Sequence, residues 1–243
     1  MNAQAFELRV FGRDFRTKLA PPAEQMTLAE LSPMAGHLCD QVAAVAAGQL
    51  AQRGSCVACR KGCSRCCNYM VSVSAPEAMA LWGHLAALPA ARRQAIVSRY
   101  LEASRTLLAR RPPQDFAVGG QGAGAEEISQ WYSQLNLSCP FIDGGACSIY
   151  AVRPLVCREH VSSSSASCDS GSGNGGLKLP LSVAEAMSQL SVELEPSWPA
   201  AIALPVALVW ASGPDVHPRR HPSGMVLSRL ASLLQQQQAA LAA

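Results

Sequence analysis

The sequence predicts a mainly α-helical protein whose helices pack around an irregular, cysteine-rich metal-binding core containing a short β-hairpin. Leucine and alanine dominate the apolar residues and only 5% of the 243 residues are aromatic, which favours helices over sheets. Because 49% of the residues are hydrophobic, the chain can bury a core without disulfides. Nine of its ten cysteines, all except Cys39, lie in two segments, 56–67 and 139–168, which predict the metal-binding core.

The N-terminal part of the chain predicts one short strand and one long helix. Residues 6–11 alternate between apolar and polar side chains, as in a half-buried strand. Residues 27–52 have a helical pattern, and Ser32 followed by Pro33 is typical of an N-cap and a first helical residue. Cys39 lies within this apolar helix, so we expect it to be a core residue.

The stretch between the two cysteine segments predicts three further helices. Ser74 and Glu77 have the spacing of a capping box, so a helix is expected to begin there. Apolar residues at helical spacing predict a second helix over residues 89–110, and a short third helix is expected over 126–135. The proline- and glycine-rich residues 111–124 are typical of a linker between them.

A hairpin and two helices are predicted in the rest of the chain. Residues 143–145, Asp-Gly-Gly, lie between short apolar runs and resemble a hairpin turn. Residues 162–176 are rich in serine and glycine and are typical of a mobile stretch. Ser182 and Glu185 then have capping-box spacing, and the apolar residues 198–211 predict a buried helix.

These elements divide the chain into three parts. Residues 1–54 form an N-terminal strand and helix, and residues 55–170 form a cysteine-cluster metal-binding domain. Residues 171–243 form a C-terminal helical extension.

Charge and hydropathy indicate a cytoplasmic protein that binds neither membranes nor nucleic acids. Charged residues occupy the N-terminus where a signal peptide has an apolar run, and no apolar stretch is long enough to span a bilayer. The net charge of +3 is small, and the basic residues do not form a stripe with interleaved aromatics. The expected partner is an unknown protein or small molecule. Thiols stay reduced in the cytoplasm, so the cysteines point to metal binding or redox chemistry.

The spacing of the cysteines predicts one site built from both segments. On an ideal helix the cysteines of residues 56–67 fall within roughly a 100° arc, so their thiolates can converge from one side. A closed zinc site, or an iron centre such as an iron–sulfur cluster, then needs ligands from residues 139–168. Cys56 fits either a core or a ligand role. Basic and polar neighbours favour thiolates, and the predicted metal ligands are Cys59, Cys63, Cys66, Cys67, Cys139, Cys147, Cys157 and Cys168.

The cysteines occur in a fixed order with particular neighbours. The order is Cys59-x3-Cys63-x2-Cys66-Cys67, Cys139-Pro-Phe-Ile, Cys147-Ser-Ile-Tyr150, Arg153-Pro154, Cys157-Arg158 and Cys168. This order resembles the YkgJ-type cysteine-cluster family, described as a zinc- or iron-chelating domain. The resemblance implies a metal site and no particular reaction. One related class, the flagellin lysine N-methylases, carries a similar cluster, but this chain shows no glycine-rich cofactor loop.

Three residues beside the second segment each have two interpretations. Arg153 and Arg158 can neutralise the thiolates and donate hydrogen bonds to sulfur, or they can form structural ion pairs, for example with Glu77 or Glu159. His160 can be a ligand, although a lone surface histidine is the simpler interpretation.

Three functions are compatible with these features. The first is a metal-binding protein, for example an accessory or maturation factor, and the second is an iron-dependent enzyme that modifies a protein or small molecule. The third, a zinc-stabilised interaction module, is weakened by the lack of a basic stripe. The second is weakened because the sequence shows no acid–base pair near the cysteines, although iron can carry chemistry itself. The spacing from Cys59 to Cys66 matches radical S-adenosylmethionine enzymes, but Arg65 occupies their usual aromatic position and the expected barrel strands are missing.

Overall fold

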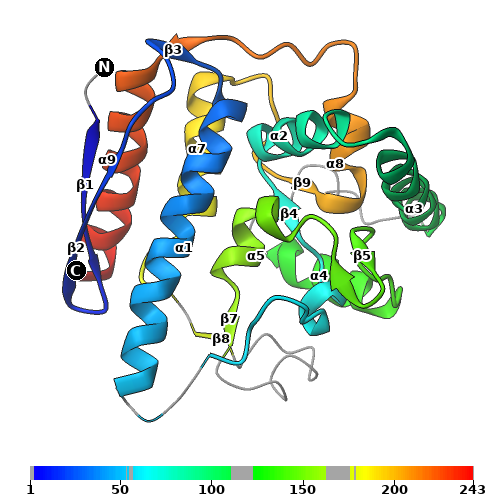
Figure 1. Cartoon of the computed structure of the whole chain (residues 1–243), viewed down its shortest axis with the longest axis horizontal. Coiled ribbons are helices and arrows are strands. Elements are labelled where there is room, and N and C mark those ends of the chain that lie inside the picture. Colours follow the sequence, from blue (N-terminus) through cyan, green and yellow to red (C-terminus); the bar gives the residue numbers. More distant parts are fainter. Residues whose placement is uncertain are drawn as a thin grey trace.

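The structure is a computed structural model, and the residues it describes are 3–52, 54, 57–110, 123–162, 176–177 and 179–242. Helices dominate the molecule (Figure 1), which confirms the predicted mainly α fold. The helices are α1 (Leu28–Gln52), α2 (Ala75–Ala86), α3 (Ala90–Ala109), α4 (Ala123–Gln134), α5 (Leu155–Glu159), α7 (Val183–Leu194), α8 (Leu204–Ala211) and α9 (Ser223–Ala242), with 3₁₀ helices η1 (Arg65–Asn68) and η3 (Tyr150–Val152).

Short antiparallel strand pairs join these helices. The pairs are β1 (Gln4–Val10) with β2 (Arg13–Leu19), β3 (Gln25–Met26) with β10 (His221–Pro222), β4 (Ser72–Val73) with β9 (Ile202–Ala203), β5 (Ile142–Asp143) with β6 (Ala146–Cys147), and β7 (Val161–Ser162) with β8 (Gly176–Leu177). Strand β1 confirms the predicted N-terminal strand, and its partner β2 was not predicted. Within the described ranges, no helix combines the length and apolar content needed to cross a bilayer.

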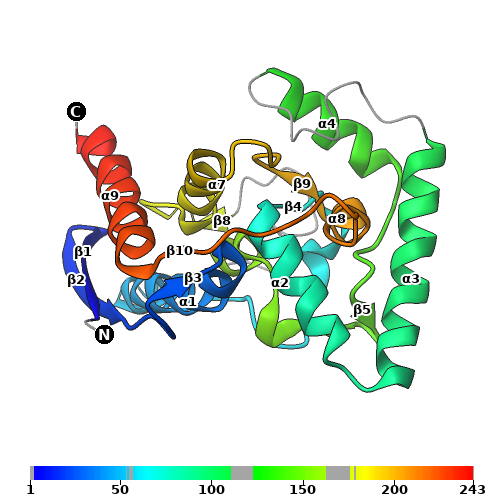
Figure 2. The ribbon, with the colours of Figure 1, turned by 90° about the horizontal axis from the view of Figure 1, so that it is seen from above.

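A helical frame, which we define as α1, α7, α9 and the β1–β2 hairpin, holds much of the hydrophobic core. The hairpin and α9 lie at one side of the molecule, and α1 and α7 stand next to them (Figures 1 and 2). Leu31 and Leu38 of α1, Leu190 of α7, and Leu230 and Leu234 of α9 are fully buried. Burial of one such side chain contributes roughly 1.5–3 kcal/mol, so apolar contacts stabilise the frame.

Helix α1 begins upstream of the predicted cap. The Glu30 backbone N–H donates to Thr27 Oγ1 (3.3 Å), and the Thr27 N–H donates to Glu30 Oε2 (2.7 Å). This capping box satisfies N–H groups at the helix start, so the helix begins at Leu28. The prediction of an N-cap at Ser32 is therefore wrong, and Pro33 lies inside the helix.

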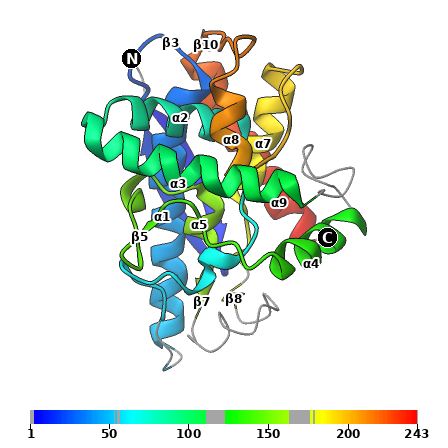
Figure 3. The same ribbon diagram turned by 90° about the vertical axis from the view of Figure 1, so that its right-hand side faces the viewer.

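Helices α2, α8 and α3 lie on the other side of α1 from the β1–β2 hairpin, and α3 runs along the outside (Figures 1 and 3). The predicted capping box of Ser74 and Glu77 is present at the start of α2. The helix predicted over residues 198–211 begins only at Leu204, because residues 202–203 pair with β4 as strand β9. The predicted start of this helix at residue 198 is therefore wrong, because the strand pairing is non-local.

The cysteine half, which we define as residues 57–69 and 139–162, consists of very short elements. Its β5–β6 hairpin confirms the predicted turn, and Gly144 and Gly145 adopt the positive φ angles of 54° and 79° that favour glycine. Most of the two predicted linkers, residues 111–122 and 163–175, lies outside the described residues. The three-domain division stays a prediction; one hydrophobic core contains residues from all three parts.

Candidate metal centre

A cavity of about 490 Å³ lies between the C-terminal half of α1 and the cysteine half. Residues from both predicted cysteine segments line it together. Cys168 lies outside the described residues, as does Cys56. The other predicted ligands all line the cavity: Cys59, Cys63, Cys66, Cys67, Cys139, Cys147 and Cys157.

Backbone hydrogen bonds attach the second cysteine segment directly to the first. The short helix η1 carries Cys66 and Cys67, and the Cys139 N–H donates to the Cys67 carbonyl oxygen at 2.7 Å. Next to this link, the Ser138 hydroxyl donates to Asn68 Oδ1 at 3.0 Å. The two segments are therefore in direct contact at the cysteines themselves, 72 residues apart in the chain.

A buried carboxylate positions the helix that carries Cys157. Glu77 Oε1 accepts a hydrogen bond from the Leu155 N–H (2.8 Å) at the start of α5, while its Oε2 accepts from the Ser74 N–H (2.9 Å). Burial raises the pKa of Glu77, and these hydrogen bonds oppose that shift. Glu77, which completes the capping box of α2, thus also orients α5. Its capping-box spacing did not reveal this second role.

Five thiols affect one another's ionisation, and we call Cys66, Cys67, Cys139, Cys147 and Cys157 the five-thiol cluster. The Cys67 thiol donates a hydrogen bond to Cys66, which lowers the pKa of Cys66 to about 7 and raises the pKa of Cys67. Burial, and then the charge of neighbouring thiols, raises the pKa of Cys139 to about 11 and that of Cys157 above its usual value. Several thiolates can therefore coexist here only when a cation balances their charge.

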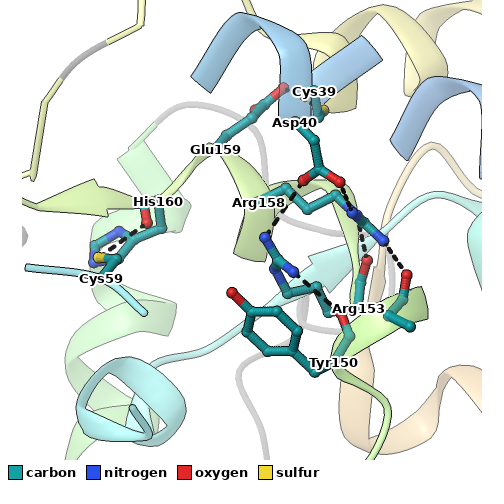
Figure 4. A network of polar contacts seen from close by, with 9 residues as sticks. Cys39, Asp40, Cys59, Tyr150, Arg153, Arg158, Glu159 and His160 are labelled. Atoms are coloured by element: carbon teal, nitrogen blue, oxygen red, sulfur yellow. Dashed lines mark hydrogen bonds and ion pairs between the residues drawn. The ribbon is translucent and has the colours of Figure 1, made fainter. Parts of the chain in front are cut away.

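Cys59 lines the cavity beside strand β7. The Ser162 N–H donates to Cys59 Sγ (3.3 Å), and Cys59 Sγ donates to the His160 carbonyl oxygen (3.6 Å). The Ala58 N–H donates to the Ser162 carbonyl oxygen (2.8 Å), which holds the two segments together at this point. Figure 4 shows the Cys59 thiol and His160 side by side.

His160 is not the solvated surface residue of the simpler prediction. It is half-buried and lines the cavity, and its ring forms a T-shaped pair with the Tyr69 ring, with centroids 6.1 Å apart. Burial lowers the pKa of His160. Its Nε2 atom is buried and lacks a hydrogen-bond partner among the described residues.

The two arginines pair with Asp40 of α1, which the sequence did not single out. Arg158 Nη1 lies 2.5 Å from Asp40 Oδ2, and Arg153 Nη2 lies 3.4 Å from Asp40 Oδ1 (Figure 4). Both arginines therefore pair with Asp40 and not with Glu77 or Glu159. Burial raises the pKa of Cys147 while the Arg153 charge opposes this shift, so Arg153 also favours a thiolate.

Cys39 lies apart from the cavity, in agreement with its predicted core role. Its side chain is fully buried in α1, and Cys39 Sγ donates to Glu159 Oε1 at 3.6 Å. Burial, followed by the charge of Glu159, raises the pKa of Cys39 well above its usual value. This thiol therefore stays protonated and is a poor metal ligand.

The donor chemistry of the cavity fits zinc or iron. Thiolates and imidazoles are the ligands that zinc and iron–sulfur clusters use in proteins. Across the described ranges, no three histidine, cysteine, aspartate or glutamate side chains are already arranged to hold an ion.

Comparison with protein-family models supports this chemistry. Residues 58–174 match the model CxxCxxCC, described as a "putative zinc- or iron-chelating domain". The match covers a little under half of the chain and confirms the resemblance drawn from the cysteines. In this chain three residues, not two, separate Cys59 from Cys63. Searches of curated proteins and of solved structures gave no match.

Proposed function

We propose that this protein binds zinc or iron in a composite thiolate centre built from both cysteine segments. The observation that carries the proposal is the five-thiol cluster, whose members come from η1, the β5–β6 hairpin region and α5 and influence one another's ionisation. A bound cation would stabilise the thiolates, and the half-buried cavity would shield the bonds from water. The family description supports metal binding in general.

The number of thiols favours a centre with more than one metal atom. One tetrahedral zinc ion takes four ligands, whereas seven described cysteines line the cavity. An iron–sulfur cluster or a pair of ions would use the additional thiols. When bound, an iron–sulfur cluster supplies electron transfer, and zinc supplies structural stabilisation or Lewis acidity.

Metal analysis of anaerobically purified protein tests this function. We expect stoichiometric zinc or iron in the wild type, with an absorption band in the visible range for an iron–sulfur cluster. Cys66→Ala and Cys157→Ala, one from each segment, should both lose metal, while the buried Cys39→Ala should retain it. Substoichiometric metal with all thiols freely titratable in the wild type would refute the proposal, and loss in only one of the two ligand variants would refute a composite centre.

An iron-dependent enzyme is the second candidate, and the size of the cavity favours it. A volume of about 490 Å³ exceeds what one ion needs and falls within the range of roughly 300–1,000 Å³ for small-molecule pockets. Ala43 and Ala47 of α1 and the rings of Tyr69 and Tyr150 line part of the wall. A small molecule could therefore bind beside the metal.

The enzyme and the binding protein differ in whether the metal has an open coordination position. Cyanide and azide are small probes of such a position in an iron centre. A change in the absorption or electron paramagnetic resonance spectrum of the anaerobic holoprotein on adding either probe would favour the enzyme. An unchanged spectrum would favour a closed centre that only stores or carries metal or stabilises the fold. Bound zinc in place of iron would favour the interaction module.

A further inference from the structure

The His160 imidazole has a buried nitrogen that lacks a partner in the described part of the chain. Its Nε2 atom is screened from solvent, yet it neither donates nor accepts a hydrogen bond there. Leaving a buried polar atom unsatisfied is costly, so such an atom in a folded protein usually has a partner. A metal ion is a partner that would satisfy an imidazole nitrogen at this place.

The neighbours of His160 are those of a ligand. The residue lines the same cavity as the seven described cysteines, and the Cys59 thiol contacts its carbonyl oxygen at 3.6 Å. The Ser162 N–H donates to Cys59 Sγ at 3.3 Å, a contact that a thiolate would keep, whereas the contact with the carbonyl oxygen is made by the protonated thiol. A thiol and an imidazole thus lie together, and thiolate and imidazole are both common zinc and iron ligands.

Two contacts fix the orientation of this pair. The Tyr69 ring meets the imidazole edge-on at an interplanar angle of 77°. The hydrogen bond from the Ala58 N–H to the Ser162 carbonyl oxygen joins the backbone that carries Cys59 to strand β7. Fixed orientation matters for a ligand, because a ring that is already placed loses little freedom when the metal binds.

We propose that His160 Nε2 is a metal ligand and acts beside the Cys59 thiolate at the β7 end of the cavity. The proposal rests on the metal-binding function above and adds a nitrogen donor to a centre that the cysteine pattern describes as sulfur alone.

X-ray absorption spectroscopy at the edge of the bound metal detects this donor directly. We expect the wild-type holoprotein to show scattering from an imidazole nitrogen at about 2.0–2.1 Å in addition to sulfur at about 2.3 Å. His160→Gln should lose the imidazole scattering and bind metal at least about tenfold more weakly, since even outer-sphere changes reduce affinity by this much. His217→Gln, which alters an exposed histidine in a loop, should match the wild type.

The outcomes separate this inference from the proposed function. Wild-type protein with bound metal but no imidazole scattering overturns the inference and leaves the thiolate centre in place. Imidazole scattering that persists in His160→Gln also overturns it. Wild-type protein without metal overturns the proposed function and this inference together. If His160→Gln fails to fold, a wild-type spectrum without imidazole scattering still overturns the inference.

Discussion

The helical frame and the cysteine half are stabilised in different ways. In the frame, long helices bury leucines such as Leu38, Leu190 and Leu230 completely. In the cysteine half, strands have two residues and α5 has five, and isolated elements of this length are unstable. Phe141, Ile149 and Leu155 of this half are buried in the hydrophobic core. Polar links also hold it, such as Arg158 to Asp40 and Glu77 to the Leu155 N–H. We infer that hydrophobic burial suffices for the frame, whereas the cysteine half also depends on these links and on metal.

The largest expected effect is the loss of the centre through Cys66→Ala. Metal binding contributes about 10–16 kcal/mol to the folding of small zinc domains, so its loss should unfold the cysteine half. Hydrogen–deuterium exchange should become fast in η1, β5, β6 and α5, while α7 and α9 keep their protection. Chelation of metal from the wild type should give the same map. Equal loss of protection in both regions would contradict the separate stabilisation of the frame.

The second effect tests the strongest polar link between the two regions. The buried Arg158 guanidinium donates to Asp40 Oδ2 and to the Ala151 carbonyl oxygen, both at 2.5 Å, and to the Arg153 carbonyl oxygen at 3.1 Å. Arg158→Ala leaves these acceptors without their donor, and we expect a loss of about 2–4 kcal/mol, reduced by the partial exposure of Asp40.

Urea denaturation of the holoprotein measures this loss. Arg158→Lys should recover only part of the stability, because an ammonium group cannot reproduce the planar fork of three donors. Arg105→Ala, which removes an exposed arginine of α3, is the matched control and should change stability by less than about 0.5 kcal/mol. If Arg158→Ala behaves like Arg105→Ala, the link to α1 does not stabilise the cysteine half.

Local sequence signals predicted much of the fold. The misplaced N-cap at Ser32 was a local error, because Thr27 and Glu30 form the capping box instead, and non-local contacts account for the other errors. The capping box at Ser74 and the glycine turn at 144–145 act within a few residues, so sequence reasoning found both. The pairing of β4 with β9 and the ion pair of Asp40 with Arg158 join residues more than 100 positions apart, and no local pattern marks either partner. Such contacts depend on the complete fold.

The candidate site shows the same division. The cysteine spacing predicted that both segments meet, and seven of its eight predicted ligands do line one cavity. The position of Cys59 beside strand β7 depends on the backbone of Ser162, which no spacing rule contains. The burial of His160 Nε2 depends likewise on how β7 packs, so a lone histidine in the sequence resembles a surface residue.

A smaller effect is expected from Glu77→Gln, which weakens the link between Glu77 and the Leu155 N–H. Both carboxylate oxygens of Glu77 accept hydrogen bonds from N–H groups, so the amide nitrogen of glutamine would face a donor. We expect a loss of about 1–3 kcal/mol. Glu102→Gln, at an exposed position of α3, is the matched control and should have no measurable effect.

The pH dependence of this loss has a defined sign. Because burial raises the pKa of Glu77 above its usual 4.5, the folded state binds this proton more tightly than the unfolded state. The stability advantage of wild type over Glu77→Gln should therefore be largest below pH 4.5 and should shrink as pH rises through the folded pKa. An advantage that grows over this range, in urea denaturation at several pH values, would show that hydrogen bonds to the carboxylate outweigh its burial.

The smallest effect is expected from Cys39→Ala, which tests the comparison of the two regions with a cysteine of the helical frame. Cys39 is a cysteine of the frame helix α1, fully buried, with a protonated thiol against Glu159. Its removal deletes one sulfur atom from an apolar core and should lower stability by only about 1 kcal/mol. Metal content and the spectrum of the centre should remain those of the wild type, in contrast to Cys66→Ala. Loss of metal in Cys39→Ala would mean that the centre reaches into the frame, and the two regions would then share one source of stability.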